Sequence, residues 1–152
     1  MRNKALLLCI TLLCVLCIAS LGVLGLLEFK RGELRASVTI ETHSITGVNG
    51  GSVRHMTLAQ DDTMADDYVA LAKNAPIWYT DPDNRAFVFF GSKPADAVKA
   101  VACDMHGNEI QLSCAQNIIE LPQTNGQYTI GVWADHGRDT ALYAFRVHIV
   151  GD

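Results

Sequence analysis

TNGQYTIGVWADHGRDTALYAFRVHIV, residues 124–150, is the stretch that decides the fold. Apolar side chains alternate with polar ones along both of its halves, and this period of two is typical of half-buried β-strands. The DHGRD segment between the halves has the composition of a tight turn. We therefore predict two antiparallel strands, with Trp133 on the outward face of the first. The inward positions are Tyr128, Ile130, Val132, Ala134, Tyr143, Phe145, Val147 and Ile149.

The same period begins near residue 37, well upstream of this pair. SVTIETHSI, residues 37–45, places Val38 and Ile40 on one face. The Asn-Gly-Gly segment at 49–51 favours a turn, and SVRHMTL, residues 52–58, alternates again. Residues 37–152 are therefore predicted to form one mainly β domain, an antiparallel sandwich.

One segment departs from this pattern. In AQDDTMADDYVALAKN, residues 59–74, apolar residues recur at helical spacing, and Asp61 or Asp62 could cap the first turn. We expect one short helix across the end or edge of the sheets. Its carboxylates lack the alternating spacing and glycine turn of a calcium loop, so complementarity to the helix dipole is the favoured explanation.

The segment APIWYTDPDNRAFVFFG, residues 75–91, is rich in aromatic residues. A DPDN turn at 81–84 separates two apolar runs, which predicts a hairpin. Strand aromatics usually pack inside, so this hairpin is expected at the centre of the core, and an aromatic ligand platform is the alternative. The aromatic residues are Trp78, Tyr79, Phe87, Phe89 and Phe90.

Two cysteines flank the next predicted hairpin. An Asp104-to-Gly107 turn sets a register in which Cys103 faces Glu109 and Cys114 faces Val98. This register separates the thiols too far for a disulfide, whereas a shifted register would permit one. Cys103 and Cys114 are thus a candidate disulfide, with reduced packing thiols as the other interpretation.

The N-terminus is a different kind of sequence. Residues 5–27 run uncharged for 23 residues, which is long enough to span a bilayer. We predict a cytoplasmic head (1–4), a transmembrane signal anchor (5–27) in contact with membrane lipid, and a stalk (28–36). A cleaved signal peptide is the rival interpretation. Basic residues flank both ends of the segment, so the charge rule decides orientation weakly. The short head favours an extracytoplasmic domain and single-pass localisation in the cell membrane, with a cytoplasmic domain as the alternative.

Composition and spacing narrow the function classes. The net charge is −4 and the basic residues are scattered, which argues against nucleic-acid binding. No histidine stands at zinc-ligand spacing from a cysteine or a second histidine, and no local pattern pairs a nucleophile with a base. We therefore predict no catalytic residue, no metal and no cofactor. An enzyme whose site is assembled from distant residues is the least favoured alternative.

The segment Gly126-Gln127-Tyr128-Thr129-Ile130 resembles the G-x-Y-x-hydrophobic entry to the penultimate strand of immunoglobulin-like sandwiches. In that family the tyrosine hydroxyl ties the preceding corner, and a tryptophan on a central strand packs in the core. Trp78 is similar to that tryptophan, but Ile130 stands where an antibody-type domain has cysteine. The resemblance is to disulfide-free versions, and the layout looks like that of small membrane-anchored extracytoplasmic proteins of Gram-positive bacteria.

These observations predict a non-catalytic, membrane-tethered binding or sensing domain for a protein, peptide or cell-wall partner. A structural spacer, or an accessory subunit of a membrane complex, is the alternative. Exposure of Trp133 would favour binding, and burial of Trp133 under the helix would favour the spacer. The partner is expected on the loops at one end of the sandwich, or on an open edge strand. The candidate loop residues are Asp81, Asp83, Asn84, Trp133, Asp135, His136 and Arg138.

Overall fold

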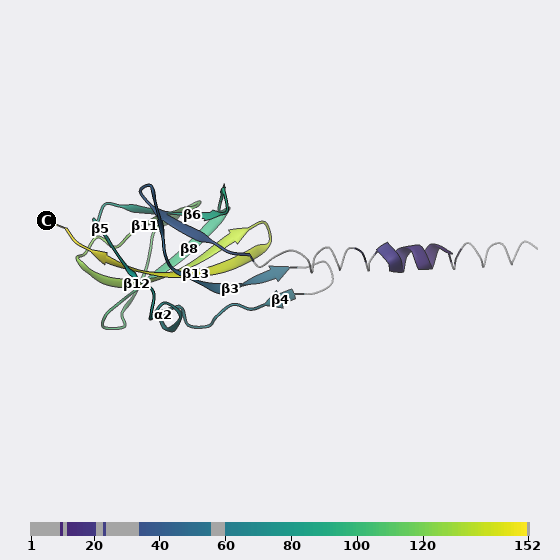
Figure 1. Ribbon diagram of the computed structural model, residues 1–152, viewed down its shortest axis with the longest axis horizontal. Coiled ribbons are helices and arrows are strands. Elements are labelled where there is room, and N and C mark those ends of the chain that lie inside the picture. Colours follow the sequence, from purple (N-terminus) through teal and green to yellow (C-terminus); the bar gives the residue numbers. More distant parts are fainter. Residues whose placement is uncertain (1–9, 11, 21–22, 24–33, 56–59, 152) are drawn as a thin grey trace, which may run out of the picture. The chain divides into compact units, whose positions relative to one another are not determined.

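The computed structural model describes residues 10, 12–20, 23, 34–55 and 60–151 (Figure 1). The chain divides into two units, residues 1–32 with 56–59 and residues 33–55 with 60–152, and each is described separately. The second unit contains every strand that the structure describes.

In the first unit, residues 12–20 are helical and their apolar side chains are exposed. The Ser20 hydroxyl donates a hydrogen bond to the Cys17 carbonyl (2.8 Å). Within the described residues, none of the helices has the length and apolarity that a membrane span requires. The predicted anchor is described only in part, and the predicted head and residues 28–33 of the predicted stalk lie outside the described residues.

The second unit is mainly β, as predicted, with its described strands in two sheets. The first sheet has the order β10-β11-β6-β1-β2, with β7 paired to β6, and all its pairs are antiparallel. Its strands are β1 (Ser37–Ile40), β2 (His43–Ile45), β6 (Arg85–Phe90), β7 (Lys93–Pro94), β10 (Cys114–Ala115) and β11 (Ile118–Glu120).

The second sheet has the order β4-β3-β13-β12-β8-β9. Its pairs are antiparallel except that β5 runs parallel to the last part of β13. Its strands are β3 (Val48–His55), β4 (Gln60–Asp62), β5 (Ile77–Thr80), β8 (Ala97–Asp104), β9 (Glu109–Gln111), β12 (Gly126–His136) and β13 (Asp139–Ile149).

The core lies between the two sheets. The eight predicted inward positions of β12 and β13 are all buried, none more than 6% exposed, and they join one cluster. The first sheet contributes Val38, Ile40, Val88 and Ile119 to the same cluster. The predicted turn is confirmed as well, because His136 pairs with Asp139 and leaves Gly137 and Arg138 as its two-residue loop. Period-two alternation therefore identified this part of the core correctly.

Two buried tyrosines fix chain corners through their hydroxyls. Tyr128 donates to the carbonyl of Thr124 (3.1 Å) at the entry to β12. Tyr143 donates to the Ile45 carbonyl (2.8 Å) and accepts from the Gly47 N–H (2.7 Å), where the chain passes from β2 to β3. Because β2 and β3 belong to different sheets, Tyr143 stabilises a crossing between the layers.

The short helix α2 (Tyr68–Leu71) lies on the outer face of the second sheet, against β12, β13 and β3 (Figure 1). Its cap is Asp67, whose carboxylate accepts from the N–H groups of Val69 and Ala70. The prediction of one short helix is thus confirmed. Its predicted cap is wrong, because Asp61 and Asp62 lie in β4 and pair with β3, and the helix covers a sheet face rather than an end or edge.

The predicted turn at Asn49–Gly51 is also wrong, since these residues lie inside β3. Gly51 has a φ of 83° near the point where the β3–β13 register shifts. The positive φ that the sequence signalled therefore serves a bulge. The predicted single strand at 37–45 is instead a β1–β2 hairpin, because Ile40 pairs with His43 and leaves a two-residue turn at Glu41 and Thr42.

The expected aromatic hairpin at 75–91 does not form. The DPDN turn exists, with the Asn84 N–H donating to the Asp81 carbonyl (3.3 Å), but it joins β5 of one sheet to β6 of the other. Alternation in β6 turns Phe87 and Phe89 away from the core and only Phe90 into it.

Trp78, compared above with the family's core tryptophan, is half-buried on the edge strand β5, and Tyr79 beside it is 67% exposed. The comparison of Trp78 with a tryptophan on a central strand is therefore wrong. The expected aromatic centre of the core is only partly right: Phe90 joins the core cluster and the half-buried Trp78 packs against it, whereas Tyr79, Phe87 and Phe89 lie outside it.

Both cysteines of the sandwich are free thiols. The predicted Cys103–Glu109 register is confirmed, but Cys114 belongs to β10 in the other sheet and does not face Val98. Cys103 packs in the cluster beneath α2, whereas Cys114 packs against the central core. Burial raises the pKa of each thiol above its ordinary value.

Candidate functional site

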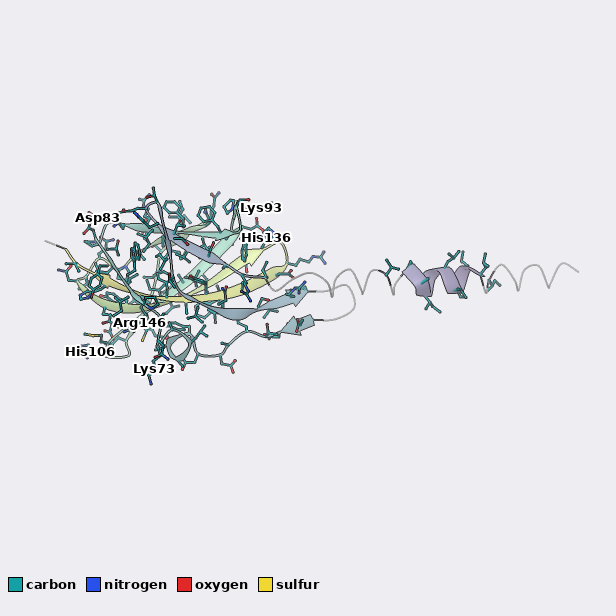
Figure 2. The ribbon with its side chains drawn as sticks, in the orientation of Figure 1. Lys73, Asp83, Lys93, His106, His136 and Arg146 are labelled. Atoms are coloured by element: carbon teal, nitrogen blue, oxygen red, sulfur yellow. The ribbon has the colours of Figure 1, made fainter. Side chains whose placement is uncertain are left out.

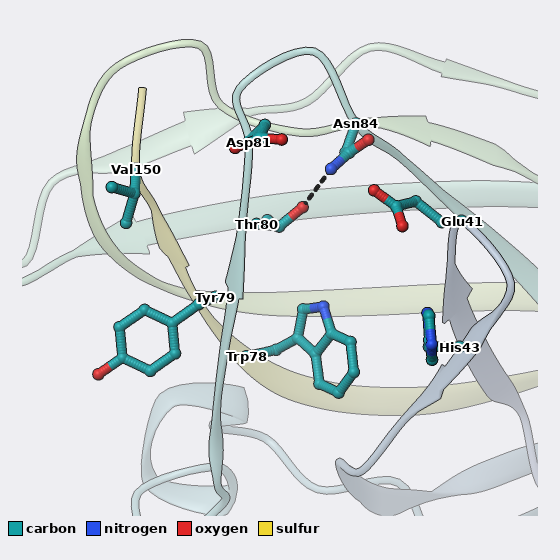
Figure 3. Close-up of a pocket in the computed structure, with 8 residues that line it drawn as sticks. All are labelled: Glu41, His43, Trp78, Tyr79, Thr80, Asp81, Asn84 and Val150. Atoms are coloured by element: carbon teal, nitrogen blue, oxygen red, sulfur yellow. Dashed lines mark hydrogen bonds between the residues drawn. The ribbon is translucent and has the colours of Figure 1, made fainter. Parts of the chain in front are cut away.

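A pocket of about 520 Å³ opens where the β1–β2 turn, β5 and the DPDN turn meet (Figure 3). Thr80 and Val150 contribute to its wall. The side chains that give it chemical character are Glu41, His43, Trp78, Tyr79, Asp81 and Asn84.

The aromatic residues of the pocket come from β5. Trp78 and Tyr79 are neighbours on a strand, so their rings point to opposite sides of the backbone, as Figure 3 shows. The Trp78 ring lies 5.9 Å from the His43 ring, centroid to centroid, and the Tyr79 ring stacks on His148 at 5.2 Å. The Trp78 ring also packs against the central core, so it is half-buried, whereas Tyr79 keeps most of its surface exposed.

Glu41 enters the pocket from a strained turn. Its φ is 54°, a left-handed conformation that costs a residue other than glycine about 1 kcal/mol. Its carboxylate lies on the same side of β5 as the Trp78 indole (Figure 3). The hairpin therefore presents a carboxylate from a position where glycine would be the easier residue.

The DPDN turn closes the other side of the pocket. The Asn84 Nδ2 donates to the buried Thr80 hydroxyl (2.7 Å), and the Gln123 Nε2 donates to the Pro82 carbonyl (2.6 Å). These bonds hold Asp81 at the rim, where its side chain is exposed. Because the turn is tied on both sides, the pocket is largely preformed.

The predicted binding loops do not share one end of the sandwich. Asp81 and Asn84 line the pocket, and Asp83 lies in the same turn without lining it. β5 runs parallel to β13, so the DPDN turn lies where β13 finishes, and the DHGRD turn lies where β13 begins. Figure 2 shows Asp83 and His136 at opposite ends. The expectation of one shared binding end is therefore wrong.

The side chains of the DHGRD turn brace their own hairpin. Asp135 accepts from the Thr140 hydroxyl (2.6 Å), and Asp96 accepts from the Gly137 N–H (2.7 Å). The His136 ring packs against Phe90 with its Nδ1 3.9 Å from the Asp96 carboxylate. Arg138 is exposed at the tip. These contacts explain the side-chain composition of the turn without a bound ligand.

Trp133 is half-buried beneath α2. Its ring meets the Tyr68 ring edge-on with centroids 5.7 Å apart, and both pack in the outer cluster. Tyr68 in turn donates to the Glu109 carboxylate (3.0 Å), and burial followed by that carboxylate raises the tyrosine pKa. Because α2 covers Trp133, this residue favours the spacer interpretation over binding.

Sequence reasoning missed four of the eight residues that line the pocket, which are Glu41, His43, Thr80 and Val150. Glu41 and His43 were assigned to a continuous strand, and no signal in the sequence placed them beside Trp78. The aromatic run at 78–79 did carry a signal, because neighbouring aromatic residues on a strand can form a ligand platform. Tertiary structure alone brings the hairpin at 41–43 to that platform.

A second pocket, of about 320 Å³, lies at the β10 edge of the first sheet. Its lining includes Arg85 and Glu120, which face each other on paired strands, so its charges are balanced internally. Across the described residues, the acidic, cysteine and histidine side chains form no group of three or more that could hold a metal ion. The first pocket is therefore the stronger candidate.

No protein-family model matches the chain, and neither does any curated protein or solved structure.

Proposed function

We propose that this chain is a non-catalytic, membrane-tethered extracytoplasmic protein whose immunoglobulin-like domain binds a partner at the Trp78 pocket. The observation that carries the proposal is the pocket itself, which joins aromatic surface, two carboxylates and an amide on a tied framework. Preformed hollows with a few convergent polar groups are typical binding sites.

Strand order supports the immunoglobulin-like assignment. β6, β8, β9, β10, β11, β12 and β13 follow the order B, C, C′, D, E, F and G of that family, with β1 in the place of strand A. The Tyr128 hydrogen bond to Thr124 matches the family's tyrosine corner. The departures are the absence of a tryptophan in β8, the additional elements β2–β5 with α2 between β1 and β6, and the additional strand β7.

The argument for a membrane tether comes from the sequence. The uncharged 23-residue run is long enough for a bilayer, and a short basic head favours a cytoplasmic N-terminus. An extracytoplasmic sandwich would then present its pocket to proteins, peptides or the cell wall.

The second candidate is a spacer or accessory subunit, favoured by the cover of Trp133 by α2. In that case contacts with a membrane complex would run through the N-terminal segment rather than the pocket.

Photo-crosslinking of the full chain in its native membrane separates the two candidates. We expect Tyr79→p-benzoylphenylalanine to give a discrete adduct that Trp78→Leu abolishes, because Tyr79 is 67% exposed at the pocket. The matched control is Arg138→p-benzoylphenylalanine at the opposite end, which should give none. Equal adducts from both positions, or adducts from Leu13→p-benzoylphenylalanine alone, would contradict the binding proposal.

A further inference from the structure

We propose that the Trp78 pocket binds the positively charged side chain, lysine or arginine, of an extended peptide segment. This inference rests on the proposed function and specifies its ligand.

Charge is the first argument. The pocket presents the carboxylates of Glu41 and Asp81, and none of its eight lining residues is lysine or arginine. Both carboxylates belong to exposed residues, so they attract a cation without the desolvation cost of a buried pair. A neutral or anionic ligand would leave this charge uncompensated.

The aromatic surface is the second argument. A cation above the face of tryptophan is attracted by the ring quadrupole, and tryptophan is the strongest side chain for this interaction. The Trp78 indole and the Glu41 carboxylate lie on the same side of β5 (Figure 3). An ammonium or guanidinium group between them would therefore meet the ring and a carboxylate together.

Strand edges indicate that the cation belongs to a peptide. Among the described strands, β5 pairs with β13 alone and β2 pairs with β1 alone, and both contribute residues to the pocket. Unpaired edges offer backbone N–H and C=O groups to an added strand. A peptide in extended conformation can use such an edge while one of its side chains enters the pocket.

A carbohydrate stacked on Trp78 is the main competing ligand class. Sugar binding would use the same ring but would not require a net positive charge. The difference between a charged ligand and its uncharged isostere therefore separates the two classes.

Isothermal titration calorimetry on the purified full chain provides the test. The probes are N-acetyl-Ala-Ala-Lys-Ala-Ala-amide and the same peptide with norleucine in place of lysine. We expect the lysine peptide to bind at least about tenfold more tightly, with an affinity that falls as salt rises. The double variant Glu41→Gln/Asp81→Asn should lose about tenfold in affinity for the lysine peptide.

Asp83→Asn is the matched control, because Asp83 lies in the same turn without lining the pocket. The affinity of this variant for the lysine peptide should stay at the wild-type value. Equal binding of the two peptides, binding unaffected by the double variant, or no binding of either peptide would overturn the inference. Thermal unfolding of the double variant at the wild-type midpoint confirms that a loss of binding is not a loss of fold. If Tyr79 still crosslinks while the peptides fail, the binding function stands and the ligand class is wrong; if neither is seen, both proposals fall.

Discussion

The packing of α2 on the second sheet depends on Gly131, which has no side chain. A Cβ added at Gly131 would lie 2.6 Å from Cγ of Tyr68, closer than such atoms pack. The Tyr68 ring therefore occupies the space that a side chain at position 131 would need, and its hydroxyl reaches Glu109 from there. Two effects compete at this position, because alanine is easier to order in a strand than glycine.

Gly131→Ala should lower the free energy of unfolding by about 1–3 kcal/mol, because overpacking against a ring outweighs the gain in strand propensity of about 0.5–1 kcal/mol. In a Tyr68→Ala background the ring is gone and only the Cβ of residue 68 remains, 3.1 Å from the added Cβ, so the same substitution should cost much less. Urea unfolding of the four proteins in this double-mutant cycle measures the difference. A cost that is the same in both backgrounds would show that Tyr68 does not explain the glycine.

Residue-level prediction succeeded where local chemistry decides the outcome. The inward faces of β12 and β13 and the Asp104 turn follow from alternation and turn composition alone. The turn at Glu41 was not predictable. Glu41 has a left-handed φ that glutamate does not favour, so the local sequence gives no turn signal there.

At the scale of elements, α2 is too short to be stable by its own propensity. Four residues give one turn, and isolated helices of that length do not persist in water. Its stability must come from the Asp67 cap and from the packing of Tyr68 and Ala72 on the sheet.

Asp67→Ala should therefore lower the free energy of unfolding by about 1 kcal/mol, the usual cost of losing an N-cap. The neighbouring Asp66→Ala is the control, since Asp66 is exposed and outside the cap, and it should change stability by less than about 0.5 kcal/mol. Chemical denaturation of both variants provides the comparison. A similar cost for both would mean that general acidity, rather than the cap, stabilises α2.

Element pairing was the weakest part of the sequence prediction. Two apolar runs joined by DPDN suggest a hairpin, yet β5 and β6 enter different sheets. A four-residue turn permits either outcome, and the choice depends on the partners β13 and β1, which are remote in sequence. Cys103 and Cys114 lie in different sheets for the same reason: the strands that pair with theirs are remote in sequence, so local sequence could not predict the separation.

At the scale of the whole sandwich domain, the two sheets share one core but leave unpaired edges, and the pocket occurs where β2 and β5 border each other across it. The position of the pocket follows from the topology. Because β5 runs parallel to the last part of β13, the DPDN turn that follows β5 lies at the end of the sandwich where β13 finishes. The fold class was predictable from period-two alternation. The pocket was not, because its residues come from a hairpin and an edge strand that only the assembled sandwich brings together.

The two tryptophans of the chain provide the most direct test of where the ligand binds. Trp78 lines the pocket, whereas Trp133 is covered by Tyr68 on the outer face of the second sheet. In a ¹H–¹⁵N spectrum of the full chain, with indole peaks assigned through Trp133→Phe, the lysine peptide should shift the Trp78 indole peak and leave the Trp133 peak in place. Movement of the Trp133 peak with a stationary Trp78 peak would contradict a binding site at the β2 and β5 edges.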